Sequence, residues 1–165
     1  MLEKLLDAGG DPSAALSNGN RPAHLAVRLG NPKFVEMLME ARVDPNARGE
    51  ANQPAVYMAL PGKNVKVLEV LAAGGADLNI VWSGASPLYA AISTLNWTMA
   101  TATARLGAEN KFKDAQDRSS VDLVCVMMTR AQPDKENKPG VSALLASLDK
   151  RGIAIPCAPS VVAWR

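Results

Sequence analysis

The sequence predicts an all-α protein in which a pair of helices recurs along the chain. The first observation is composition: 27 of the 165 residues are alanine and only 4% are aromatic, a balance that favours closely packed helices over a β-sandwich. The second is periodicity, because two different sequence patterns recur with the same spacing of 32 or 33 residues. Two interleaved patterns with one period indicate a repeat architecture.

The two patterns mark two places in each period. An apolar stretch followed by small and acidic residues starts at Leu5, Leu38, Leu71 and Thr103. A polar residue and then a short helical run begins at Arg21, Gln53, Ser86 and Ser119. We therefore expect each period to contain a helix, a short turn, a second helix and a long polar loop.

Local signals place the ends of these helices. Proline has a fixed φ and needs no amide partner in a first helical turn, and it opens the first helix at Pro22, Pro54 and Pro87. Asparagine is a favoured N-cap, and it precedes the second helix at Asn31, Asn64 and Asn96. Asn96 also starts a glycosylation acceptor pattern, but its register with the other two asparagines favours capping.

These signals divide one predicted domain, 1–165, into successive repeats. The boundaries are 1–20 for a partial repeat, then 21–52, 53–85, 86–118 and a divergent 119–153, with a tail over 154–165. The chain opens inside a second helix, so either Met1 is the natural start or the chain is a fragment of a longer array. The polar, proline-flanked insertion 131–140 is predicted to be a mobile loop.

One second helix lacks the apolar residue that the others share. Thr103 stands where Leu38 and Leu71 stand in earlier repeats. Because threonine is β-branched and offers less apolar surface than leucine, this helix is predicted to be poorly anchored. On this interpretation, Thr103→Leu should stabilise the protein.

The repeated segments carry a recognisable signature. They read R-P-A-H-L-A at 21–26, Q-P-A-V-Y-M at 53–58 and S-P-L-Y-A-A at 86–91, with L-A-A-G-G-A-D-L-N at 71–79. This pattern resembles the ankyrin repeat, whose period is about 33 residues and whose signature is T-P-L-H-x-A. The resemblance covers residues 1–130 and, more weakly, 141–153. It implies an ankyrin-repeat solenoid of about four to five units with short β-hairpin fingers.

Charge and composition exclude several classes of function. A net charge of +2 is too small for nucleic acid or an anionic membrane to be the main partner, and no apolar run reaches the roughly 18–20 residues of a membrane span. The first residues contain no signal-peptide core, and we expect a cytoplasmic location. Cys125 and Cys157 form no CxxC motif and predict no disulfide framework. We expect Cys125 to be a small buried residue and Cys157 an exposed thiol.

For each residue that could take part in catalysis, we favour a structural role. His24 is the only histidine and so the obvious general base, but the ankyrin resemblance assigns this position to hydrogen bonds that tether loops. Val56, Tyr89 and Asp122 take its place in the other repeats. An acidic residue recurs once per repeat, at Asp11, Asp44, Asp77 and Glu109, where turn formation is favoured over acid–base work. We therefore expect no enzyme activity, no cofactor and no metal site.

The sequence also predicts one partner-binding face. In an ankyrin-like array the concave floor should contain Arg28, Leu60 and Ser93, and the adjacent fingers should carry Arg48, Trp82, Lys111 and Phe112. Arginine and aromatic residues of this kind are enriched in binding hot spots. Trp82 either packs against neighbouring fingers or contacts the partner, and the competing locations for a partner are the insertion 131–140 and the apolar tail.

These features together predict a non-catalytic, monomeric module that binds another protein as a scaffold or inhibitor. A sharper version is an immunity-type inhibitor of one cognate toxin or enzyme. The alternative is a regulatory or targeting ankyrin domain cut from a larger enzyme or from a host-directed effector.

Overall fold

The computed structural model describes residues 9–130, 138–155 and 157. Its contacts form two compact units, Met1–Asp77 and Leu78–Arg165, which we call the N-terminal unit and the C-terminal unit and describe separately. Within the described residues, regular structure is helical apart from isolated β-bridges, as predicted for an all-α chain. No helix in these ranges combines the length and the apolar character that a membrane crossing requires.

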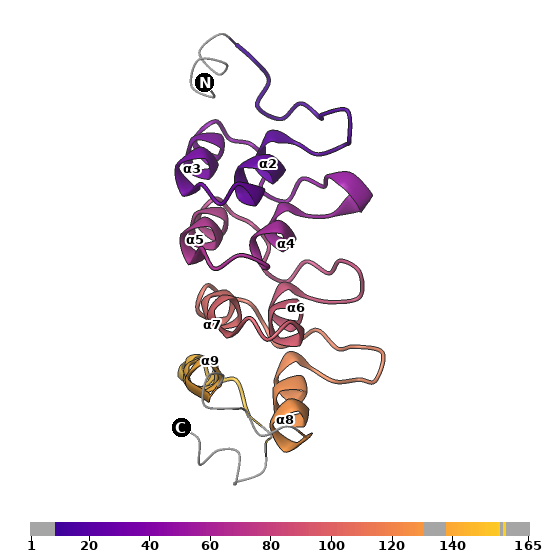
Figure 1. Cartoon of the computed structure of the whole chain (residues 1–165), viewed down its shortest axis with the longest axis vertical. Helices are drawn as coiled ribbons and strands as arrows, with labels where there is room; N and C mark the ends of the chain where they lie inside the picture. The colour runs from indigo at the N-terminus through magenta and orange to yellow at the C-terminus, as the bar shows by residue number, and fades with distance from the viewer. Residues whose placement is uncertain (1–8, 131–137, 156, 158–165) are drawn as a thin grey trace. The chain divides into compact units, whose positions relative to one another are not determined.

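The N-terminal unit contains two helix pairs. The helices are α2 (Pro22–Arg28), α3 (Pro32–Glu40), α4 (Ala55–Ala59) and α5 (Val65–Ala73), and a short 3-10 helix, η1 (Glu50–Asn52), lies in the loop before α4. Within this unit α2 packs against α3 and α4, and α5 packs against α3 and α4 (Figure 1). The predicted order of helix, turn, helix and loop is confirmed here.

The C-terminal unit also has four described helices. They are α6 (Pro87–Ser93), α7 (Trp97–Arg105), α8 (Ser120–Arg130) and α9 (Lys138–Lys150). α6 packs against α7 and α8, and α7 packs against α9. Because α9 begins at Lys138, the last three residues of the predicted loop 131–140 are helical instead. The rest of that loop, 131–137, and the tail beyond Cys157 lie outside the described residues.

The asparagine caps are where the sequence predicted them. Each Oδ1 atom accepts a backbone N–H group two or three residues ahead: Asn31 from Lys33 at 3.1 Å, Asn64 from Lys66 at 3.2 Å, and Asn96 from Met99 at 3.3 Å. Pro22 and Pro87 are the first residues of α2 and α6, and Pro54 directly precedes α4. An N-cap satisfies an amide that the helix itself leaves without a partner, so these caps fix where each second helix starts.

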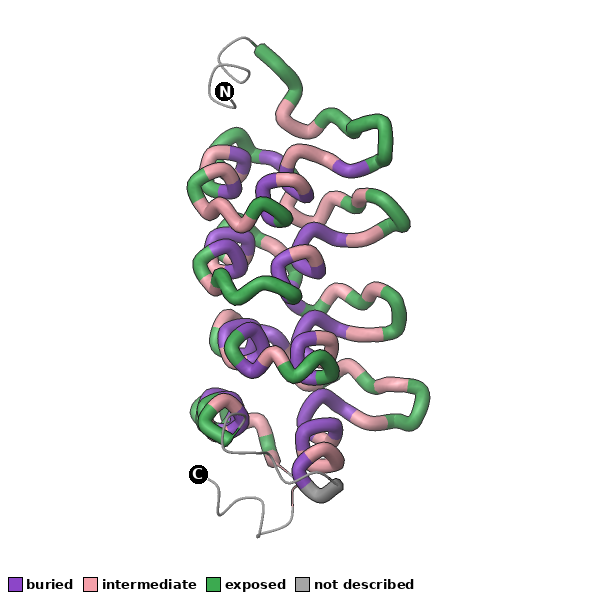
Figure 2. Tube along the Cα trace, in the orientation of Figure 1, coloured by how far each residue is buried: buried purple, intermediate pink, exposed green. Residues whose placement is uncertain are grey.

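Aliphatic side chains form the centre of each unit. In the N-terminal unit Leu38, Leu68 and Leu71 are fully buried, and in the C-terminal unit Leu88 and Ile92 are (Figure 2). Burying such a side chain contributes about 1.5–3 kcal/mol. The predicted apolar register is confirmed, since Leu38 and Leu71 occupy equivalent places in successive second helices.

Helix α7 is well packed, which corrects the prediction that it is poorly anchored. Thr103 is 0% exposed, and its hydroxyl group donates a 2.6 Å hydrogen bond to the carbonyl of Met99. α7 also lies very close to α9, because a Cβ added to Gly140 of α9 would stand 2.5 Å from Cβ of Trp97. The small side chains on α7 therefore let α9 pack closely against it, and this close packing anchors α7 as a buried leucine anchors the second helix in the other repeats.

The three loops between helix pairs are the fingers of the fold. We call 47–54 the first finger, 79–86 the second and 110–119 the third. Each is closed by one isolated antiparallel bridge: Arg48 with Pro54, Trp82 with Ala85, and Lys113 with Ser119. The predicted β-hairpins are therefore too short to count as strands. In the first finger, Pro54 has no N–H group with which to extend a ladder.

A disulfide bond joins Cys125 to Cys157, which corrects the prediction of two unpaired cysteines. Their Cα atoms are 5.1 Å apart although 32 positions separate them in sequence. Directly after α9, Arg151 donates hydrogen bonds to the carbonyl groups of Ala104, Gly107 and Ala108. These contacts hold the segment after α9 against the C-terminal end of α7, where carbonyl groups lack helical partners.

Candidate functional site

The third finger is fastened to α6 by the carboxylate of Asp114. Its Oδ2 atom accepts the Tyr89 O–H at 2.6 Å and the Arg118 Nε–H at 2.8 Å. Its Oδ1 atom accepts the backbone N–H groups of Gln116 and Arg118, both at 2.9 Å. The side chain of Asp114 is only 7% exposed. A carboxylate that accepts four hydrogen bonds in this way fixes the shape of the finger and its position on the helix.

The same contacts set the charge of the cluster. The hydrogen bond from Arg118, and then the one from Tyr89, hold the pKa of Asp114 far below its usual range. Burial, and then the hydrogen bond to Asp114, raise the pKa of the Tyr89 hydroxyl. Asp114 is therefore ionised and Tyr89 neutral at physiological pH, and both keep the protonation state that the cluster needs.

Tyr89 also joins this cluster to an aromatic residue of the third finger. The rings of Tyr89 and Phe112 meet edge to face with their centroids 5.2 Å apart, and both side chains are half-buried. Beside them Lys111 is 83% exposed and forms a 2.7 Å ion pair with Glu109. Edge-to-face aromatic pairs are stabilising, so Phe112 is held in place and not free to collapse onto the core.

The second finger presents the other predicted aromatic residue. Trp82 and Ala85 exchange backbone hydrogen bonds of 3.1 and 3.2 Å, and the two residues between them, Ser83 and Gly84, have φ values of 51° and 73°. This is the backbone of a two-residue type I′ turn. Trp82 is half-buried, and its neighbour Val81 is 49% exposed. The tip of this finger therefore combines a rigid turn with exposed apolar surface.

The signature position of His24 fastens a finger in both units. In the N-terminal unit His24 Nε2–H donates to the carbonyl of Gln53 at 3.1 Å, and its Nδ1 atom accepts the Arg21 N–H at 3.2 Å. In the C-terminal unit Tyr89, at the equivalent position, reaches Asp114. Burial lowers the pKa of His24, which favours the neutral ring that these two hydrogen bonds require. The predicted tethering role is confirmed.

The remaining predicted site residues differ in exposure. Arg28 is exposed at the end of α2, Ser93 is exposed at the end of α6, and Arg48 is exposed on the first finger. Leu60 is only 5% exposed and does not offer a binding surface, which corrects the prediction. Leu60 is the C-cap of α4 and is buried, and the residue after it, Pro61, is exposed instead.

Sequence reasoning missed a second set of tethers, made by asparagines at the base of the fingers. Asn46 Oδ1 accepts the Asp77 N–H at 2.7 Å, and Asn79 Oδ1 accepts the Glu109 N–H at 2.7 Å. Both asparagines fasten one repeat to the backbone of the next. Their spacing of 33 residues was the available signal, but a recurring polar residue in a loop does not reveal its partner.

The comparisons with known proteins agree with this geometry. The family model of the ankyrin repeat matches residues 18–50. Residues 18–50 are an ankyrin repeat. Over 83 residues, 49% of this chain, the sequence is 30% identical to the glycerophosphocholine phosphodiesterase gde1 of Schizosaccharomyces pombe (strain 972 / ATCC 24843). The match covers 7% of that protein, so this chain corresponds to a small part of its relative.

In the matched repeat, the side chain of Asn20 also holds the first finger in place. Asn20 accepts the Glu50 N–H at 3.2 Å and donates to the Glu50 carboxylate at 3.2 Å. The finger backbone passes so close that a Cβ on Gly49 would lie 2.5 Å from Asn20 Oδ1 and 2.8 Å from the His24 ring. Glycine is needed there for close approach. The matched repeat thus holds its finger in a fixed position.

Proposed function

We propose that this chain is a non-catalytic ankyrin-repeat module that binds another protein. On this proposal the helix pairs are ankyrin repeats, about four to five in all, and in each unit the fingers and first helices form the binding face. The observation that carries it is the pair of fingers in the C-terminal unit, which present Trp82 and Phe112 from rigidly held loops. Ankyrin repeats generally mediate protein binding, which supports the same conclusion.

Rigidity is what makes these fingers suitable for binding. A loop that must be ordered by its partner loses affinity, because immobilising each flexible side chain costs about 0.5–1.5 kcal/mol. Here the Asp114 cluster and the type I′ turn have already ordered both fingers. Half-buried aromatic residues on such a surface are the usual anchors of protein interfaces. Lys111, which is 83% exposed, and its ion-pair partner Glu109 place charged groups beside Phe112, where charge affects the rate of association.

Two functions fit this surface. As an inhibitor of the immunity type, the module would cover the active face of one cognate toxin or enzyme. As a regulatory or targeting domain, it would act within a larger enzyme, and one observation favours this second function: its curated relative is named as a phosphodiesterase and is far longer than the matched segment. The single-domain organisation, the monomeric state, the absence of enzyme activity and the cytoplasmic location stay predictions.

The test is affinity capture from native lysate with mass spectrometry, using the wild type, Trp82→Ala and Phe112→Ala as baits. The control is Leu95→Ala, which removes an apolar side chain that is 48% exposed outside the fingers of the same unit. We expect one partner that Trp82→Ala and Phe112→Ala weaken by roughly 2 kcal/mol or more, as hot-spot truncations do, while Leu95→Ala retains it. Circular dichroism checks that each bait is folded.

The competing location is tested with a deletion of residues 132–136. If this deletion abolishes capture and both aromatic variants keep it, the finger surface is not the binding site. If the recovered partner is an enzyme, its activity with and without the module separates inhibition from regulation. If the chain recovers no protein, and its melting temperature rises strongly with a small metabolite, the binding-module proposal is wrong.

A further inference from the structure

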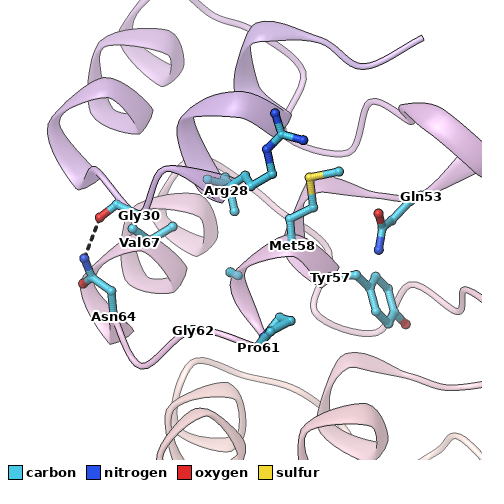
Figure 3. A pocket seen from close by; sticks show the side chains of 11 residues that line it. Arg28, Gly30, Gln53, Tyr57, Met58, Pro61, Gly62, Asn64 and Val67 are labelled. Atoms are coloured by element: carbon cyan, nitrogen blue, oxygen red, sulfur yellow. Dashed lines mark hydrogen bonds between the residues drawn. The ribbon is translucent and has the colours of Figure 1, made fainter. Parts of the chain in front are cut away.

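A groove in the N-terminal unit is distinct from the fingers of the C-terminal unit. It has a volume of about 490 Å³ and lies between the ends of α2 and α4 (Figure 3). Its floor consists of the buried residues Val27, Tyr57, Ala59 and Val67, and its rim of residues that reach solvent: Arg28, Gly30, Gln53, Met58, Pro61, Gly62 and Asn64. This volume is within the usual range of about 300–1,000 Å³ for ligand sites.

The groove is formed before any ligand arrives. Asn64 Nδ2–H donates a 2.7 Å hydrogen bond to the carbonyl of Gly30, seen as the dashed line in Figure 3. This bond joins the turn after α2 to the turn after α4. Asn64 is fixed in turn, because its Oδ1 atom caps α5. One end of the groove is therefore closed by the same residues that set the spacing of the two repeats.

The charge on the groove has one sign. Arg28 is the only charged residue among its eleven lining residues. Within the described part of the chain, its guanidinium group has no hydrogen-bond or ion-pair partner. In Figure 3 the Arg28 side chain extends to the same side of the helices as Met58. A guanidinium group offers a planar set of donors that matches a carboxylate, so the groove complements an acidic group next to apolar surface.

The uncharged rim fits a peptide more closely than a simple carboxylic acid. The side-chain amide of Gln53 makes no hydrogen bond to another described residue, and it offers one acceptor and two donors. A peptide unit needs one donor and one acceptor. Met58 beside it is flexible and polarisable, and such side chains adapt to the shape of an apolar partner. The groove thus presents groups for an acidic side chain, for a peptide backbone and for an aliphatic side chain.

We propose that this groove binds an extended segment of a partner protein in which an acidic residue stands next to an aliphatic one. Arg28 pairs with the carboxylate, Gln53 with the backbone, and Met58 and Pro61 with the aliphatic side chain. The proposal rests on the function proposed above, in that the ligand is a protein. It does not depend on the two fingers of the C-terminal unit, since all the residues that carry it lie in the N-terminal unit.

The experiment selects ligands directly. Random dodecamer peptides displayed on phage are selected against the full chain, and in parallel against Arg28→Gln. The selected peptides are synthesised with capped ends, and their dissociation constants are measured by fluorescence anisotropy. We expect peptides with a glutamate or aspartate beside a leucine, isoleucine or valine. Arg28→Gln, or glutamine in place of the acidic residue, should weaken binding at least roughly fivefold, as the loss of one ion pair of about 1 kcal/mol does.

Matched variants keep the outcome specific. Arg42→Gln makes the same change of charge at an exposed arginine of the same unit and should leave affinity unchanged. Met58→Ala should weaken binding, and Trp82→Ala should not. Raising NaCl to about 0.5 M should reduce the preference for glutamate over glutamine, because exposed charges are screened.

If selection yields no common motif, or a motif without an acidic residue, or if Arg28→Gln binds equally well, the proposal is wrong. Lysate capture through Trp82 is a separate result, so the two proposals fail independently.

Discussion

Replacing Thr103 by leucine tests how α7 is packed. The sequence favours this change, because the equivalent positions Leu38 and Leu71 are leucines. The structure reverses the expectation, since Thr103 is 0% exposed and its hydroxyl already has a partner in the Met99 carbonyl, 2.6 Å away. A larger side chain there has no solvent to enter, so it must displace the neighbouring helix or leave its preferred rotamer.

The magnitude follows from these contacts. Overpacking a well-filled core costs about 1–3 kcal/mol, and losing a hydrogen bond of this kind costs about 0.5–1.5 kcal/mol. The additional buried carbon, worth about 0.8 kcal/mol per CH₂ group, offsets part of this. We therefore expect Thr103→Leu to lower the free energy of unfolding by about 1–3 kcal/mol. Thr103→Val, which keeps the shape and replaces the hydroxyl group by a methyl group, should cost less.

Urea denaturation followed by tryptophan fluorescence measures these differences, because Trp97 lies on the same helix. Thr98→Leu is the control, since Thr98 is an exposed residue of α7 and surface changes usually stay within about 0.5 kcal/mol. A Thr103→Leu variant with a higher urea midpoint and an unchanged slope would refute the reasoning. It would mean that the core beside Thr103 contains enough space for a leucine side chain.

Three further changes probe other parts of the fold. Leu71→Ala should cost about 2–5 kcal/mol in chemical denaturation, because Leu71 is fully buried, and a neutral result would show that the repeat register is wrong. Burial lowers the pKa of His24 below 6.5, so below about pH 6.5 the unfolded state binds more protons and stability falls. Melting curves between pH 7.5 and 5 should show this decline in the wild type and less of it in His24→Gln. Cys125→Ser opens a loop spanning 32 positions and should cost about 2–4 kcal/mol under oxidising conditions, whereas under reducing conditions the wild type should match the variant.

The parts of the fold that sequence could predict are those set by neighbours along the chain. Asn31, Asn64 and Asn96 cap helices through amides only two or three residues away, so their register alone identified them. The buried leucines follow from the period of the helix, and the tethering role of His24 from its place in the signature. In each case the sequence spacing is itself the structural cause.

The parts that sequence could not predict depend on segments brought together by folding. Nothing local to Cys125 indicates Cys157, and Thr103 looks deficient until α9 is seen to pack against α7, with Gly140 close to Trp97. At the candidate site, Trp82 and Phe112 could be chosen as aromatic residues in loops. The rigidity of the third finger required the contact between Tyr89 and Asp114, which no pattern in the sequence foretold.

The disulfide also has a topological consequence. Residues Cys125 and Cys157 with everything between them form a closed covalent ring that contains α9. A protease that cut the backbone once between 131 and 137 would open this ring without releasing a fragment. The piece carrying α9 would stay bonded to α8, and the protein would run as one band on a gel until a reductant separated the two pieces. The C-terminal helix is thereby secured against the loss of its own peptide connection.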